Sequence, residues 1–177
     1  MRRLILMTVV FAGTLFAVNA TAVAQGSWQN SVADFSKICV RSLLVPNELA
    51  AALKDRGMSA ASSQYAPPDW DGALYSATDG ARGVSVTYQR YSDLTISNCI
   101  TVAPNAASRD DLENLRSMLE TNPGIGKIEG RILEAAPTTK IAMFKRPGNA
   151  PIVTFLFTSM ASATTLSMTR FDSKPGN

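Results

Sequence analysis

Residues 84–102 read VSVTYQRYSDLTISNCITV, and this stretch decides the fold class. Val84, Val86 and Tyr88 alternate with small polar residues, and the alternation resumes after Ser92 and Asp93. A two-residue period interrupted by turn residues is typical of a β-hairpin with one apolar and one small polar face. The apolar row of the second strand is Leu94, Ile96, Ile100 and Val102. We expect it to share the apolar face with the row of the first strand.

Downstream and upstream of the hairpin, further strands are expected over residues 73–77, 127–134, 139–145, 152–158 and 163–171. They are separated by Pro-, Gly- and Ser-rich breaks, and such short connections favour antiparallel pairing. Residues 58–70 lack any period, are rich in Ser and Ala, and contain Pro67 and Pro68. This composition predicts a surface loop.

Three helices are expected. Residues 28–42 carry an apolar stripe at spacings of three and four, and Ser27 fits the N-cap. A second helix opens at Pro46 and ends at Gly57, which suits the left-handed position after a helix. Residues 108–121 form the third, with a capping box from Ser108 and Asp111.

The order of helices and strands predicts an α+β fold. An N-terminal helical hairpin and one further helix are expected to pack on an antiparallel sheet of about six to seven strands. Residues 25–173 are expected to form one domain, and residues 174–177 a disordered tail. The halves share a plan of helix followed by meander, without a sequence repeat that would establish a duplication.

Residues 1–24 have the layout of a secretory signal peptide, with Arg2 and Arg3, an apolar run over residues 4–18, and small residues before Gln25. The apolar run is short of the roughly 20 residues of a membrane span. Cleavage before Gln25 leaves a periplasmic or secreted protein without a stable membrane anchor. The leader holds two of the 17 basic residues and none of the 14 acidic ones, so the mature chain has a net charge of +1. This charge gives no reason to expect nucleic-acid binding.

Cys39 and Cys99 are the two cysteines, and export favours a disulfide between them. Cys99 falls on the small polar face of its strand, and Cys39 borders the apolar stripe of the first helix. The bond is therefore expected to join helix to sheet. An alternative follows from the same spacing, in which the helical pair covers the small-residue face of the hairpin.

The chain contains no histidine, and no serine precedes a lysine in the S-x-x-K arrangement. The usual general base and the commonest zinc ligand are therefore missing, and we expect no metal, no cofactor and no catalytic residues of these types. Two carboxylate hypotheses remain, a calcium site at Asp69, Asp71 and Asp79, and a glycosidase pair among the acids Asp69, Asp71, Asp93 and Glu129. Asp-Gly turns and a solvated surface explain the same residues.

The candidate binding residues are Tyr65, Trp70 and Arg146. Tyr65 and Trp70 bracket a Pro-rich loop, and aromatic side chains on loops supply contact area in recognition. Burial of Trp70 at the edge of the core is the alternative. Arg146 belongs to a possible cationic rim at strand ends, with Arg82, Arg90 and Lys145, although solubility at sheet edges explains these residues equally well.

These features favour a non-enzymatic binding protein of the bacterial envelope, an adaptor or an inhibitor, whose partner is another envelope protein or a cell-wall component. The layout resembles small envelope proteins of Gram-negative bacteria in architecture alone, which assigns no residue. The alternative is an envelope hydrolase using carboxylates or a serine–lysine pair formed in space. A hydrolase requires two converging ionisable groups in a pocket, whereas a binding protein requires an exposed apolar patch, and a small-ligand carrier a large apolar cavity.

Overall fold

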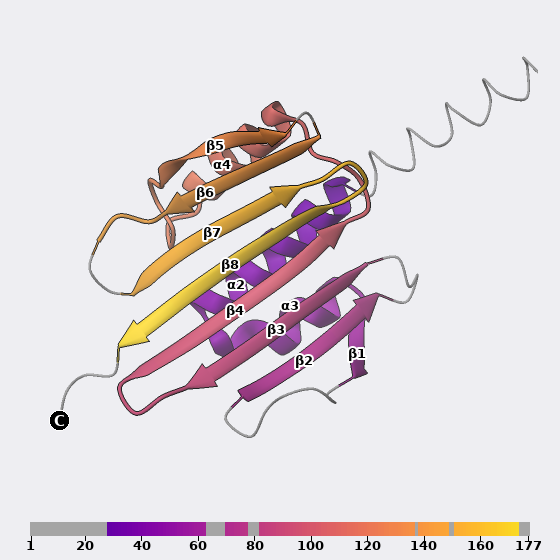
Figure 1. Cartoon of the computed structure of the whole chain (residues 1–177). Helices are drawn as coiled ribbons and strands as arrows, with labels where there is room; N and C mark the ends of the chain where they lie inside the picture. The colour runs from indigo at the N-terminus through magenta and orange to yellow at the C-terminus, as the bar shows by residue number, and fades with distance from the viewer. Residues whose placement is uncertain (1–27, 63–69, 78–81, 137, 149–150, 174–177) are drawn as a thin grey trace, which may run out of the picture.

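The computed structural model describes residues 28–62, 70–77, 82–136, 138–148 and 151–173. Its eight strands form one antiparallel sheet in the order β1-β2-β3-β4-β8-β7-β6-β5 (Figure 1). The strands are β1 (Met58–Ser62), β2 (Trp70–Ala77), β3 (Gly83–Arg90), β4 (Leu94–Ala103), β5 (Glu129–Ala136), β6 (Thr139–Lys145), β7 (Ile152–Ser159) and β8 (Thr164–Ser173). The α+β class is confirmed, with eight strands instead of about six to seven.

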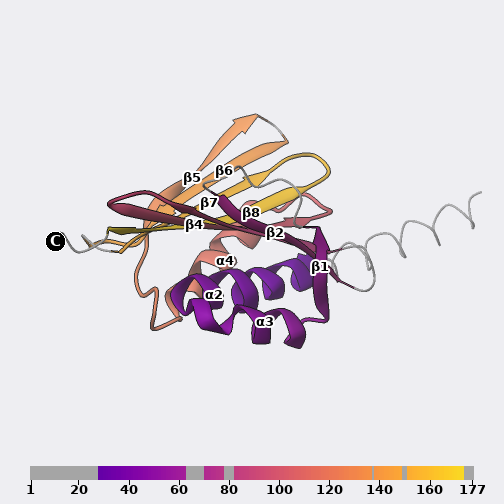
Figure 2. The same ribbon diagram turned by 90° about the horizontal axis from the view of Figure 1, so that it is seen from below.

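Every described helix lies on the same side of the sheet (Figure 2). Residues 28–34 are helical and continue through the π-helical segment η1 (Phe35–Val40) into α2 (Arg41–Leu44). A short 3₁₀ turn, η2 (Pro46–Glu48), then leads into α3 (Leu49–Asp55). α3 is followed by Gly57 at φ 64°, the left-handed position that its sequence predicts. The predicted helical hairpin is confirmed.

The third helix is α4 (Arg109–Glu120). The Ser108 hydroxyl accepts from the Asp111 backbone N–H, and the Asp111 carboxylate accepts from the Ser108 N–H, so the capping box is confirmed. α4 stands between β4 and β5 in the chain, as the N-terminal helices stand before β1. Each half thus has its helices before four strands, a helical hairpin in the first half and α4 in the second, and the halves join where β4 pairs with β8 in the middle of the sheet.

The prediction of a loop over residues 58–70 is wrong at both ends. Residues 58–62 form β1, which pairs with β2 as an edge strand, and Trp70 already belongs to β2. Small Ser and Ala residues have little intrinsic preference for strands, so the pairing with β2 and the burial of Met58 decide the conformation. Residues 63–69, together with the predicted turn at Asp79, lie outside the described residues.

The rows of β3 and β4 that share a face of the sheet also differ from the prediction. Val84 pairs with Thr101, Val86 with Cys99, so the apolar row of β3 shares its face with the small row of β4. The Tyr91 N–H donates to the Leu94 carbonyl oxygen at 2.8 Å, so Ser92 and Asp93 form a two-residue turn. Because Tyr91 then stands opposite Leu94, the residues in phase with Tyr91, and not those in phase with Val84, share the face of Leu94. The helices cover this mixed face, as in the alternative considered from sequence. Leu94, Ile96, Ile100 and Val102 therefore lie on the opposite face.

Small residues on β4 let the first helix approach the sheet. Cys39 on η1 and Cys99 on β4 are joined by a disulfide with Cα atoms 5.2 Å apart, as the sequence predicts. Closing a loop of 60 residues in the unfolded chain is worth about 4 kcal/mol of stability in the loop-entropy description. The bond therefore holds the helical layer to the centre of the sheet.

The core lies between the sheet and the helices. Phe157 on β7 contacts three other rings, with centroids 5.5 Å from Phe35, 6.0 Å from Phe144 and 6.2 Å from Phe155. Phe35 comes from the first helix, so the ring cluster joins the helical layer to β6 and β7. Aromatic pairs at these separations add to the free energy gained by area burial alone.

Candidate interaction surface

The sheet face opposite the helices is not covered by any described residue (Figure 2). We call it the open face. In the middle of β3, β4, β7 and β8, alternate residues are buried under the helices, whereas the intervening ones are half-buried or exposed. On antiparallel sheets the solvated face is normally polar. The open face departs from this rule, because it carries large apolar side chains.

The clearest apolar feature of the open face is a line of outward residues at matching register across six strands. We call it the central row, and in strand order it is Leu74 (β2), Ser85 (β3), Ile100 (β4), Ser167 (β8), Leu156 (β7) and Met143 (β6). Leu74 and Leu156 are each 47% exposed and Met143 is 43% exposed. A second line, displaced along the strands, brings Ile96, Phe171 and Ile152 into register. A row of uncharged polar residues, Thr87, Asn98, Thr169 and Thr154, lies between the two apolar lines.

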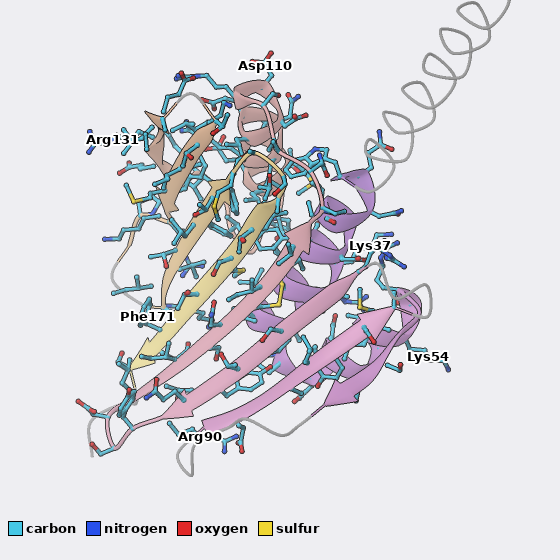
Figure 3. All side chains as sticks on the ribbon, turned by 45° about the vertical axis from the view of Figure 1, so that its right-hand side comes forward. Lys37, Lys54, Arg90, Asp110, Arg131 and Phe171 are labelled. Atoms are coloured by element: carbon cyan, nitrogen blue, oxygen red, sulfur yellow. A yellow bond between two sulfur atoms is a disulfide. The ribbon has the colours of Figure 1, made fainter. Side chains whose placement is uncertain are left out.

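Charge is absent from the middle of the open face. Among the outward residues of β3, β4, β7 and β8, none is Asp, Glu, Lys or Arg. Outward charges begin at Lys145 on β6 and at Glu129 and Arg131 on the edge strand β5. In Figure 3 the labelled charged residues lie on helices, at a strand end or on β5, whereas Phe171 lies on β8. Depletion of charge is the compositional mark of the centre of a protein interface.

Polar groups at the centre of the open face bind one another. The Ser167 hydroxyl donates to Asn98 Oδ1 at 3.0 Å, and the Thr169 hydroxyl donates to the same oxygen at 3.2 Å. An oxygen already satisfied in this way costs less to remove from water than an unpaired one. Covering Asn98 Oδ1 therefore costs less than covering an oxygen without a hydrogen-bond donor.

A shallow depression of about 230 Å³ adjoins the central row. Its lining is mainly apolar and comprises Leu74, Gly83, Ser85, Ile100, Val102 and Pro104. Ser85 is small and stands between Leu74 and Ile100 in register, so the row is hollowed at β3. The depression has room for an aliphatic side chain from a partner.

On the helical side, a buried ion cluster has a structural role. The Asp34 carboxylate, on the first helix, accepts from Arg56 Nε at 2.6 Å and from Arg82 Nη1 at 2.9 Å. The Asp34 side chain is only 2% exposed. Arg56 follows α3 and Arg82 precedes β3, so one carboxylate joins three segments of the N-terminal half.

A second arginine, Arg170 on β8, holds the C-terminal end of α2. Its guanidinium donates to the carbonyl oxygens of Leu43 at 2.6 Å and Leu44 at 3.2 Å, and it also binds Asp172. A cation at this end of a helix satisfies free carbonyl groups and opposes the helix dipole. Arg170 therefore fixes the end of this helix to β8, whereas the disulfide at Cys39 fixes it to β4.

The structure does not bring the candidate binding residues together. Tyr65 lies outside the described residues, and Trp70 opens β2 with its backbone paired to Gln89. Arg146, after β6, donates to the carbonyl oxygens of Gly124 and Pro151, which gives it a structural role in the loops beside β6. The recognition role of Tyr65 and Trp70 stays a prediction.

The cationic rim is dispersed. Arg82 binds Asp34, Arg90 pairs with Asp71, and Lys145 is on β6 in the other half of the sheet. Asp71 is on β2 and Glu129 is on β5 at the opposite edge, so these two carboxylates of the glycosidase hypothesis lie apart. Asp69 and Asp79 lie outside the described residues, so the calcium hypothesis stays a prediction. Within the described residues, no group of three His, Cys, Asp or Glu side chains could hold a metal ion. No described helix is long and apolar enough to cross a membrane.

One described tyrosine has a perturbed acidity. Tyr88, on the helical face of β3, has its pKa raised above the ordinary value, first by burial and then by the charge of Tyr75. Both rings line a shallow hollow near the end of β2 and β3, with Asp71 and Val86. A phenol with a raised pKa stays protonated at neutral pH and supplies no base there.

The open face could not be seen from the expectation that the apolar rows of residues 84–90 and 94–102 share one face, because the two-residue turn at Ser92 and Asp93 puts these rows on opposite faces. The signal was nevertheless present, because β4 has large apolar residues on one face and Ser97, Cys99 and Thr101 on the other. Because Cys99 must reach Cys39 on a helix, the face with Ser97, Cys99 and Thr101 has to be the one that the helices cover. Comparison of the chain with protein-family models, curated proteins and solved structures gives no match.

Proposed function

We propose that this chain is an exported, non-enzymatic binding protein of the bacterial envelope, an adaptor or inhibitor that acts through the open face of its sheet. The observation that carries the proposal is the charge-free centre of this face together with the exposed Leu74, Leu156 and Met143 of the central row. Contiguous exposed apolar patches on soluble proteins mark interaction sites, because leaving them in water costs free energy that a partner recovers. Another envelope protein or a cell-wall component is the partner class.

Export rests on two observations. The first 24 residues have the layout of a signal peptide, and the Cys39–Cys99 disulfide suits an oxidising compartment such as the periplasm. The mature protein is then expected to begin near Gln25. The segment with Tyr65 and Trp70 is proposed as a further contact for the same partner.

The test is capture of the partner from the native envelope with the tagged, exported protein. Ile100→Lys places a charge at the centre of the open face and is expected to reduce the captured partner at least about tenfold, because an unpaired charge is costly at a desolvated contact. Met160→Lys is the matched control, since Met160 is 51% exposed in the β7–β8 turn, away from the central row. Equal capture by both variants would refute the proposal. Turnover of an envelope substrate that disappears on changing a single Asp, Glu or Ser would replace it with the hydrolase alternative.

A further inference from the structure

We infer that the open face binds a second copy of this chain, so that two sheets stack face to face with the helices outside. This inference rests on the proposed function, because it names the occupant of the same surface. Three properties of the face support it: its area, its lack of charge and the order of large and small residues along the central row.

The area suffices for a stable dimer. Six strands about 4.8 Å apart and about 25 Å long present roughly 700 Å² of flat surface per copy. A standard protein interface buries about 800 Å² of accessible surface per partner, and accessible area exceeds flat area because side chains project from the sheet. The charge-free centre also has no like charges to repel when it meets its own copy.

Size complementarity follows from the register. A two-fold axis parallel to the strands, between β4 and β8, places β3 of one copy against β7 of the other and β2 against β6. The central row then meets itself in reverse order. Ser85 faces Leu156 of the partner subunit, Ser167 faces Ile100 of the partner subunit, and Leu74 faces Met143 of the partner subunit.

Large residues therefore face small ones where the row is hollowed. Leu156 of the partner subunit meets the depression beside Ser85, which provides about 230 Å³ of space. Because the contact is isologous, it occurs twice in each dimer. Sheets stacked in this way pack about 10 Å apart, with strand directions within about 30° of each other.

The experiment is a residue swap followed by sedimentation equilibrium of the mature, disulfide-bonded protein. Ser85→Leu fills the depression and sets leucine against leucine, which is expected to raise the dimer dissociation constant at least about tenfold. Leu156→Ser removes the inserted side chain and is expected to weaken the dimer as well. The double variant Ser85→Leu with Leu156→Ser restores a large residue facing a small one, and its dissociation constant is expected to return toward that of the natural protein.

Compensation inside one chain does not explain such a rescue, since β3 and β7 are three strand spacings apart, about 14 Å. Thermal unfolding confirms that each variant is folded. The inference would be overturned if the protein is a monomer at about 100 µM, or if Ser85→Leu leaves the dimer dissociation constant unchanged. It would also be overturned if the double variant dimerises no more tightly than the single variants. Capture of a different protein that Ile100→Lys abolishes, with the chain monomeric, overturns the second copy and keeps the proposed function. A swap-sensitive dimer that captures nothing else supports the second copy and refutes the adaptor role.

Discussion

Replacing Asp34 with alanine is expected to lower the free energy of unfolding by about 3–5 kcal/mol, as removal of one partner from a buried ion cluster does. The Asp34 carboxylate is almost completely buried and accepts hydrogen bonds from both Arg56 and Arg82. Alanine takes away the negative charge and leaves two cations facing each other in a partly buried site. Urea unfolding of the disulfide-bonded protein measures the loss.

Asp55→Ala is the control for this prediction. Asp55 also pairs with an arginine, Arg41, but at 3.7 Å and with 65% of its side chain exposed. An exposed pair contributes at most about 1 kcal/mol, so this variant should unfold almost like the natural protein. Equal midpoints for both variants would show that Asp34 does not join the N-terminal segments.

Phe157→Ala is expected to have an effect of similar size, about 3–5 kcal/mol, because it empties the centre of the ring cluster. Phe157 is fully buried and contacts Phe35 on the first helix as well as Phe144 and Phe155. The cavity separates the helical layer from β6 and β7 at the point where they touch. The midpoint of urea unfolding measures this loss too.

Phe171→Ala is the matched variant on the other side of the sheet. Phe171 lies on the open face, where it is half-buried, and it pairs with Ile96 and Ile152 in register. In dilute protein its loss should cost less than Phe157→Ala, because part of the Phe171 ring stays in water in the folded protein, whereas Phe157 is fully buried. A larger effect of Phe171→Ala than of Phe157→Ala would mean that the two faces have been assigned wrongly.

Most of the secondary structure could be predicted from the sequence because its signals are local. The capping box at Ser108, the helix end at Gly57 and the period of residues 84–102 each depend on neighbours within a few positions. β1 could not be predicted, since its Ser- and Ala-rich residues form a strand through pairing with β2. The disulfide could be predicted from the expected export and from the presence of two cysteines, without knowledge of the distance between them.

The candidate site depends on register, which is not a local property. The pairing of two strands decides which of their rows share a face, and the pairing of Tyr91 with Leu94 puts the apolar row of β4 on the face opposite Val84 and Val86. The Asp34 cluster was missed for the same reason, because its arginines lie 22 and 48 residues away in the chain. The presence of Cys99 among small residues was the one local sign of the correct face.

The central claim is that the open face is covered in the cell, and methionine oxidation tests it most directly. Met143 in the central row and Met160 in the β7–β8 turn are similarly exposed, at 43% and 51%, so dilute purified protein should oxidise at both at comparable rates. In the intact envelope, brief peroxide treatment followed by mass spectrometry is expected to show Met160 oxidised and Met143 protected. Equal oxidation of the two methionines in the envelope would contradict the claim that this face is an interaction surface.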